Sequence, residues 1–220
     1  EHSKNKFTAS LKNNLAKSPS KHEFDAYDYR SFHFGAFNDG KMHACARVVN
    51  DNFIEATLSC SQKKSINLLA RFQDLHHGLT LKEYVSTVVY DEVESFFHSL
   101  RAQGKNLSEI GRLIRLINEG EKYLTKYLIC YALAFNRFSH IDFCFFVAKK
   151  FHCAYYERLF NCKYALKHIS FSPITDGEPC YLMQASMSDF PEEMDDIISR
   201  IVSVFERNGE PCAVNLNDIR

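Results

Sequence analysis

The stretch LSEIGRLIRLINEGEK, residues 107–122, decides the fold. An apolar run stops at Asn118-Glu119-Gly120, and an amphipathic segment follows at once. The pattern predicts a strand over about 108–117 that passes through a glycine loop into a helix over 121–138. A buried strand rarely carries charges, so its three charged residues need a functional or structural reason: Glu109, Arg112 and Arg115.

The residues after this stretch alternate between strand and helix patterns. HIDFCFFVA, residues 140–148, is almost wholly apolar and rich in strand-forming residues, which predicts a central strand buried on both faces. The remaining patterns predict a helix at 149–160, strands at 163–171 and 180–187, and a last helix at 191–207.

The residues before it begin with a polar arm and a hairpin. Residues 1–22 are rich in Lys, Asn and Ser and predict a poorly packed arm. Two strand-like runs, 29–37 and 42–50, flank an Asp-Gly turn, which favours an antiparallel hairpin. Apolar spacing then predicts helices at 64–76 and 79–103.

This order predicts an α/β (α+β) fold with a mixed sheet and helices on its faces. We expect three parts: an N-terminal arm (1–22), one domain (23–190) with a helical insertion (64–104), and a C-terminal helix and tail (191–220).

Composition excludes several classes of protein. Lys plus Arg and Asp plus Glu both total 27, so no basic excess points to nucleic acid. The eight cysteines form no Cys-x-x-Cys pair and the histidines show no metal spacing, which favours reduced thiols and no metal site. No signal peptide or membrane-spanning stretch is found, so we expect a cytoplasmic protein.

A strand that ends in a glycine loop before a helix is suited to bind an anion. The first amides of such a helix point outward and its dipole favours a phosphate, here at Gly120 and Lys122. If the next strand splays away, an amide-bearing arm such as phosphopantetheine can add itself between the two strands. An ordinary βα turn is the alternative. The candidate thioester- or pantetheine-binding residues are Leu113, Ile114, Arg115, Gly120, Lys122 and Phe145.

Residues 107–164 resemble the second half of a Gcn5-related N-acyltransferase (GNAT) domain, and YERLF, residues 156–160, resembles the start of that family's YEKLGF-like segment. The resemblance implies a mostly antiparallel twisted sheet with splayed central strands and helices on both faces. The loop departs from the family pattern, because the second glycine is missing and Glu121 disfavours a pyrophosphate. This departure favours an acyl group carried on acyl-carrier protein over free coenzyme A.

A narrower resemblance links the acyl-homoserine-lactone synthases and the long-chain N-acyl amino acid synthases. Asp25 and Asp28 match an Asp-x-x-Asp pair, Arg47 matches an arginine that ends the second hairpin strand, and Glu109 with Arg112 matches Glu-x-x-Arg. The lactone synthases carry an N-terminal segment with Trp, which this chain lacks, and the helical insertion is longer here. Both departures favour the N-acyl amino acid synthase branch.

The resemblance implies attack of an amine on an acyl thioester, with no permanently bound cofactor and with acyl-carrier protein or acyl-coenzyme A as co-substrate. Glu109 is the candidate general base, acting directly or through water, and a buried position would raise its proton affinity. A structural salt bridge, for example to Arg112, is the alternative. Tyr156 is the candidate donor to the leaving thiolate, and a core tyrosine is the alternative.

Arg47 and Arg112 are expected to hold Asp25 and Asp28 in a charged network, with fold stabilisation as the alternative, and Arg47 is also a candidate for binding an amino-acid carboxylate. A long acyl chain would be walled by phenylalanines, of which alternation lets only some face it: Phe32, Phe34, Phe143, Phe145 and Phe146. Two other functions stay open, a coenzyme-A-dependent acetyltransferase and a non-catalytic acyl-binding or sensory module.

Overall fold

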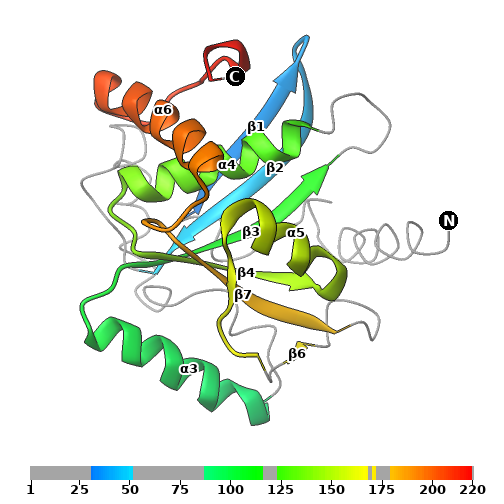
Figure 1. Cartoon of the computed structure of the whole chain (residues 1–220), viewed down its shortest axis with the longest axis vertical. Coiled ribbons are helices and arrows are strands. Elements are labelled where there is room, and N and C mark those ends of the chain that lie inside the picture. Colours follow the sequence, from blue (N-terminus) through cyan, green and yellow to red (C-terminus); the bar gives the residue numbers. More distant parts are fainter. Residues whose placement is uncertain (1–30, 52–86, 116–122, 168–169, 172–178, 220) are drawn as a thin grey trace, which may run out of the picture.

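The computed structural model describes residues 31–51, 87–115, 123–167, 170–171 and 179–219 of the 220-residue chain. Within them one mixed sheet has the strand order β1-β2-β3-β4-β7-β5, and β6 also pairs with β7 (Figure 1). Only β3 and β4 are parallel, and every other pair is antiparallel. The strands are β1 (Ser31–Asn38), β2 (Lys41–Asn50), β3 (Leu107–Arg115), β4 (Phe143–Lys149), β5 (Lys163–Tyr164), β6 (Ser170–Phe171) and β7 (Cys180–Ser186).

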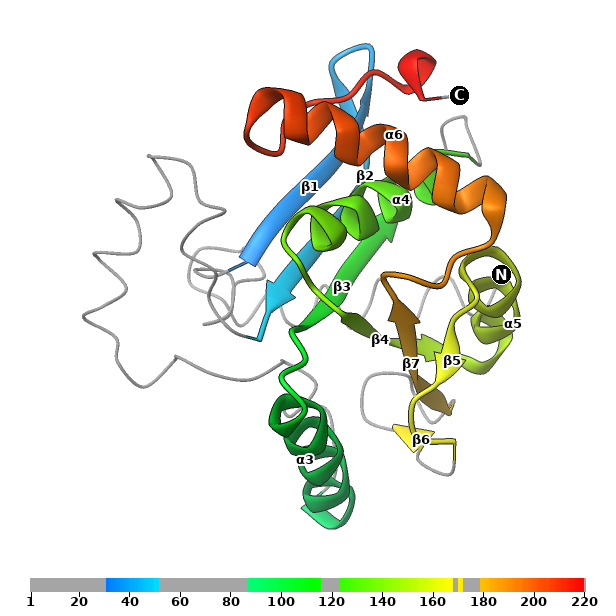
Figure 2. The ribbon, with the colours of Figure 1, turned by 60° about the vertical axis from the view of Figure 1, so that its left-hand side comes forward.

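Helices cover both faces of the sheet. Three of them, α4 (Tyr123–Phe138), α5 (Lys150–Phe160) and α6 (Glu192–Asn208), contribute to one large apolar core. The fourth, α3 (Thr87–Ala102), packs on the opposite face in a separate cluster with residues of β3, β4 and β7. Figure 2 shows α4 and α6 packed together, with α3 set apart from them. We refer to these two sides as the α4 face and the α3 face.

The hairpin forms where the sequence predicts it. Asp39 and Gly40 both adopt positive φ, 48° and 73°, as a two-residue turn of this hand requires. The short side chain of Asp39 tolerates this left-handed backbone, and Gly40 has no Cβ to oppose it. The turn therefore fixes Asn38 opposite Lys41, and a bulge between Ala36 and Phe37 then shifts the register so that Ser31 lies opposite Val49.

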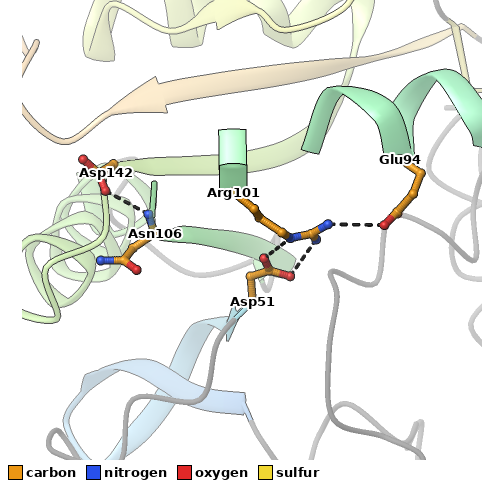
Figure 3. Close-up of polar contacts among 5 residues, drawn as sticks. All are labelled: Asp51, Glu94, Arg101, Asn106 and Asp142. Atoms are coloured by element: carbon orange, nitrogen blue, oxygen red, sulfur yellow. Dashed lines mark hydrogen bonds and ion pairs between the residues drawn. The ribbon is translucent and has the colours of Figure 1, made fainter. Parts of the chain in front are cut away.

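The two parallel strands are tied together where they begin. The Asn106 N–H donates to Asp142 Oδ2 at 2.8 Å, and the Asp142 N–H donates to the Asn106 carbonyl at 2.9 Å (Figure 3). Lys105 adds an ion pair from its Nζ to Asp142 Oδ1 at 3.0 Å. These contacts hold the starts of β3 and β4 side by side.

Farther along, the same two strands part. Their ladder pairs Leu107 with Phe143, then Ser108 with Cys144, and ends with Glu109 opposite Phe145. β3 runs on to Arg115 and β4 to Lys149 with no further pair between these described strands. Figure 1 shows the two arrows pointing apart. The splayed central strands predicted from the sequence are therefore present.

A bulge in β3 accompanies the parting. On β2, Arg47 lies opposite Gly111 and Cys45 lies opposite Ile114, so β3 contains one extra residue between these pairs. Arg112 lies in this interval with a φ of 51°, a left-handed conformation that is uncommon for a residue with a Cβ. Such a bulge bends a strand, and here it follows the last β3–β4 ladder pair by a few residues.

Helix α3 is tied to the sheet by an ion pair. Arg101, in its last turn, makes a two-pronged contact with Asp51 at the end of β2, Nε to Oδ2 at 2.5 Å and the second nitrogen to Oδ1 at 2.8 Å (Figure 3). The Asp51 side chain is only 2% exposed, and Glu94 accepts a third bond from Arg101 at 3.2 Å. The end of α3 is thus held beside the start of β3.

Most predicted elements are confirmed within one to three residues, with a few differences. The strand predicted at 163–171 is two short strands, β5 and β6. The helix predicted at 79–103 is described only from Thr87, and the arm at 1–22 and the helix at 64–76 lie outside the described residues. The division into arm, domain and tail stays a prediction. No helix in the described ranges is long and apolar enough to cross a bilayer.

Candidate active site

Glu109 lies at the point where the central strands part. It is 4% exposed and belongs to the last ladder pair of β3 with β4. Side chains alternate along a strand, so Glu109 shares the α3 face with Leu107, which packs in the α3 cluster. A Cβ built on Gly111 would lie 3.6 Å from Glu109 Oε1, so the carboxylate extends along the strand toward that glycine. A buried carboxylate therefore stands beside the opening between the strands.

Two predicted arginines lie near Glu109 in the sheet. Arg47 of β2 is 2% exposed and pairs in register with Gly111, next to the Glu109 carboxylate. Arg112 is near enough to Cys45 to act on that thiol: burial raises the pKa of Cys45, and the positive charge of Arg112 lowers it by a smaller amount. The structure thus brings Glu109, Arg47 and Arg112 to one region, while Asp25 and Asp28 lie outside the described residues.

Of the six residues predicted to bind pantetheine, Phe145 is the ladder partner of Glu109, and the other five divide into three groups. Leu113 packs toward the α4 face, against Ala44, Ala46 and Leu128. Ile114 pairs with Cys45 on β2, and Arg115 ends the strand opposite Ala44. Gly120 and Lys122 lie outside the described part of the chain. Leu113, Ile114 and Arg115 therefore lie on the part of β3 after Glu109, which does not pair with β4.

Tyr156 lies on the other face of the sheet from Glu109. It lies on α5 with its ring 4.7 Å from that of Phe146, the residue directly after the last ladder position of β4. Phe146 and Tyr156 pack in the core of the α4 face, opposite to the face of Glu109. Burial raises the pKa of Tyr156 to about 12, so its hydroxyl is protonated at neutral pH.

The phenylalanines proposed for an acyl tunnel do not form one wall. Phe32 and Phe34 stack on Phe135 of α4, at 4.4 and 5.2 Å between ring centroids. Phe143 and Phe145 belong to the α3 cluster, and Phe146 packs on α5. Strand alternation separates them over two faces, so only Phe143 and Phe145 share the face of Glu109.

Sequence reasoning did not assign two aromatic residues that complete this face. Phe97 of α3 is fully buried with its ring 4.9 Å from Phe145, and Phe96 lies 5.9 Å from the same ring. Both residues are part of the apolar stripe that predicts the helix. Combining that stripe with the alternation of β4 would have indicated the contact, had the fold been known.

The cysteines of the described residues are free thiols. Burial raises the pKa of Cys130 and Cys144 to about 12, so neither is ionised at neutral pH. A thiol is a weak nucleophile until it ionises. The site therefore offers a carboxylate for proton transfer and gives no support for a thiolate nucleophile.

The structure also has a cavity away from this site. It measures about 480 Å³ and lies between β1, α4 and the segment after α6, with a floor of Phe32, Phe34, Tyr131 and Phe135. Tyr131 donates from its hydroxyl to the Cys212 carbonyl at 2.7 Å across it. Its aromatic floor belongs to the α4 face, so the cavity is separated from Glu109 by the sheet.

The parting parallel pair within an antiparallel sheet, with helices on both faces, is the GNAT-like acyltransferase fold expected from the sequence. No family model and no curated protein matches the chain. Among solved structures it is similar to FeeM, an N-acyl amino acid synthase from uncultured soil microbes, with a TM-score of 0.53 and 12% identity over 84% of this chain and 91% of FeeM.

A second similar structure is BjaI, a CoA-dependent acyl-homoserine lactone synthase solved with SAM and isopentyl-CoA. Its TM-score is 0.52, with 11% identity over 97% of this chain and 83% of BjaI. The two similarities confirm at the level of the fold the resemblance found in the sequence.

Proposed function

We propose that the chain is an N-acyltransferase that moves a long-chain fatty acyl group from a thioester to the amine of an amino acid. The observation that carries the proposal is the parting of β3 and β4 directly after Glu109, on a fold shared with FeeM and BjaI. An extended thioester arm fits such an opening because its amides can bond to the edges of β3 and β4 that no longer pair with each other.

Glu109 is the proposed general base. The amine nitrogen attacks the thioester carbonyl carbon, and the carboxylate takes the proton that the nitrogen loses, directly or through water. The carbon–sulfur bond then breaks to give the amide and a thiolate. The Glu109 side chain is 4% exposed, so the carboxylate is shielded from bulk water at the opening.

Tyr156 is the proposed donor to the leaving thiolate. Its hydroxyl carries a proton at neutral pH, and burial raises its pKa further, to about 12. Its ring contacts Phe146, the residue that follows the last ladder position of β4, which supports a position near the opening. Arg47 on the Glu109 face, with the charge of Arg112 nearby, supplies the positive charge that the carboxylate of an amino-acid acceptor needs.

The donor is the thioester of acyl-carrier protein or of coenzyme A. The sequence Asn118-Glu119-Gly120-Glu121 favours the carrier protein, since Glu121 repels a diphosphate. BjaI, one of the similar structures, is CoA-dependent, which keeps acyl-coenzyme A as the second candidate donor.

One experiment separates the candidate functions. The full chain is incubated with a mixture of amino acids and either acyl-carrier protein or coenzyme A that carries long-chain acyl or acetyl groups, and N-acyl products are measured by mass spectrometry. Long-chain N-acyl amino acids support the proposal, and the productive thioester identifies the donor. Products from acetyl-coenzyme A alone indicate an acetyltransferase. Retained lipid without any product indicates an acyl-binding module and overturns the proposal.

A further inference from the structure

Helix α3 presents an aromatic surface to the face of the sheet that carries Glu109. The rings of Phe97 and Phe96 meet Phe145 edge-to-face, at interplanar angles of 77° and 89°. Phe97 and Phe145 are fully buried, whereas Phe96 is partly buried at the margin of the cluster. The three rings form one wall between the helix and β4, which we call the α3 wall.

The α3 wall stands directly beside the candidate base. Phe145 is the register partner of Glu109, and adjacent strands lie about 4.8 Å apart, so the two side chains are neighbours on one face. A thioester presented to Glu109 on this face has its acyl chain next to the three rings. The wall is therefore an apolar surface that lies next to the candidate base.

The position of the α3 wall is fixed by polar contacts. Arg101, one turn after Phe97, holds Asp51 with two hydrogen bonds, and its guanidinium carbon lies 5.9 Å from the Phe97 ring centroid. The ion pair joins the helix to Asp51, at the end of β2. The residue before it, Asn50, lies opposite Ser108, the neighbour of Glu109 on β3. A wall held in this way has a defined distance from the base.

We propose that the α3 wall limits the length of the acyl chain that the site accepts and that Phe96 is the specificity-determining residue. This inference rests on the proposed acyl transfer. Protein interiors are close-packed, so a ring that occupies a position excludes methylenes from it. Phe96 decides the limit because its ring lies at the open margin of the cluster, while Phe97 forms the buried centre of the cluster and supports the fold.

The test compares acyl-chain profiles of two matched variants. Phe96→Ala removes a partly buried ring that meets Phe145 at 5.9 Å, and Phe138→Ala removes one that meets Phe205 at 5.8 Å on the α4 face. We measure kcat/KM for a series of straight-chain acyl thioesters from short to long. Wild type is expected to lose activity beyond a certain length, and Phe96→Ala is expected to accept longer chains.

Each methylene newly buried in the space of the lost ring is expected to raise kcat/KM about fourfold, the equivalent of ~0.8 kcal/mol. Phe138→Ala is expected to leave the preferred length unchanged. Phe96→Leu keeps an apolar side chain, so we expect a smaller shift of the preferred acyl-chain length. This variant replaces Phe96→Ala in the test if the alanine variant does not fold.

The outcomes distinguish this inference from the proposed function. If wild type transfers acyl groups and neither Phe96 variant changes the preferred length, or if Phe138→Ala changes it equally, the α3 wall does not set the length. If wild type transfers no acyl group from any thioester, the proposed function fails and the role of the wall fails with it.

Discussion

Glu109 of β3 and Phe145 of β4 form the last facing pair before the two central strands part. The pair combines the two requirements of the proposed reaction, a base and an apolar surface for the acyl chain. A carboxylate and an apolar ring lie side by side where a thioester arm would enter. Behind this pair the strands are tied together by the contacts of Asn106 with Asp142. The strands are thus held together at one end and part at the other.

Removal of the Glu109 charge is expected to stop the reaction without unfolding the chain. Glu109→Gln keeps the shape of the side chain but cannot take a proton, so turnover should fall by about 10²–10⁴-fold. Product formation is followed by mass spectrometry. The same change at Glu206, an exposed residue of α6, is the control and should have no effect. Turnover of Glu109→Gln within twofold of wild type would remove Glu109 from the mechanism.

The space beside Gly111 gives a graded test of the position of the carboxylate. A Cβ at this residue meets Glu109 Oε1 at 3.6 Å, an ordinary contact distance, so Gly111→Ala should keep most of the activity. Gly111→Val adds two methyl groups against the carboxylate and should lower kcat/KM by about 10²-fold, as expected when a reacting group is displaced by about 1 Å. Equal activity of the two variants would show that the carboxylate is not used in this position.

The contact of Arg101 with Asp51 is expected to stabilise the fold. Arg101→Ala leaves the Asp51 carboxylate, 2% exposed, buried without this cation and should lower the free energy of unfolding by about 3 kcal/mol. Urea denaturation measures the change, and Asp51→Asn in the same chain should recover part of it. Arg200→Ala, which removes an exposed pair with Asp196 within α6, should cost about 0.5 kcal/mol or less. A similar cost for both arginines would contradict the assigned role.

The tie between β3 and β4 predicts a dependence of stability on acid pH. Burial acts to raise the pKa of Asp142, but the Asn106 N–H and Lys105 together outweigh it and lower the pKa below its usual 3.8. The ionised form is thus favoured in the folded state, so its contribution is complete above the unfolded pKa and is lost as pH falls through the lowered folded pKa.

Asp142→Asn should therefore be less stable than wild type at neutral pH, and the difference should shrink as pH falls below about 3.8. Urea unfolding over a series of pH values measures this difference. Asp91→Asn, on the exposed side of α3, is the control. A difference that stays constant over the whole pH range would show that the Asp142 charge does not tie the strands.

Local signals were sufficient to predict the elements around the site. The Asp-Gly pair specifies the hairpin turn by its backbone conformation, and Gly209 ends α6 with a φ of 71°, where a residue with a Cβ would be disfavoured. The apolar run of 140–148 indicates a central strand, and β4 lies between β3 and β7. Each of these features depends on residues that are close together in the sequence.

The rest depends on contacts between distant residues. Nothing in the local sequence marks Arg112 for a left-handed backbone, because the bulge is set by how β3 pairs with β2. The partnership of Asp51 with Arg101 spans fifty residues and follows from the packing of α3. The separation of Phe34 from Phe145 follows from strand alternation once the order of the strands is known.

The most direct test of the central claim is a crystal structure of the chain with an acyl-pantetheine analogue in which a stable thioether replaces the thioester. We predict that the arm lies between β3 and β4 beyond Glu109 and Phe145, with its amides bonded to the β3 backbone near Ile110 and Ile114 and its sulfur beside the Glu109 carboxylate. An arm bound elsewhere, or strands paired along their whole length in the complex, would contradict the account.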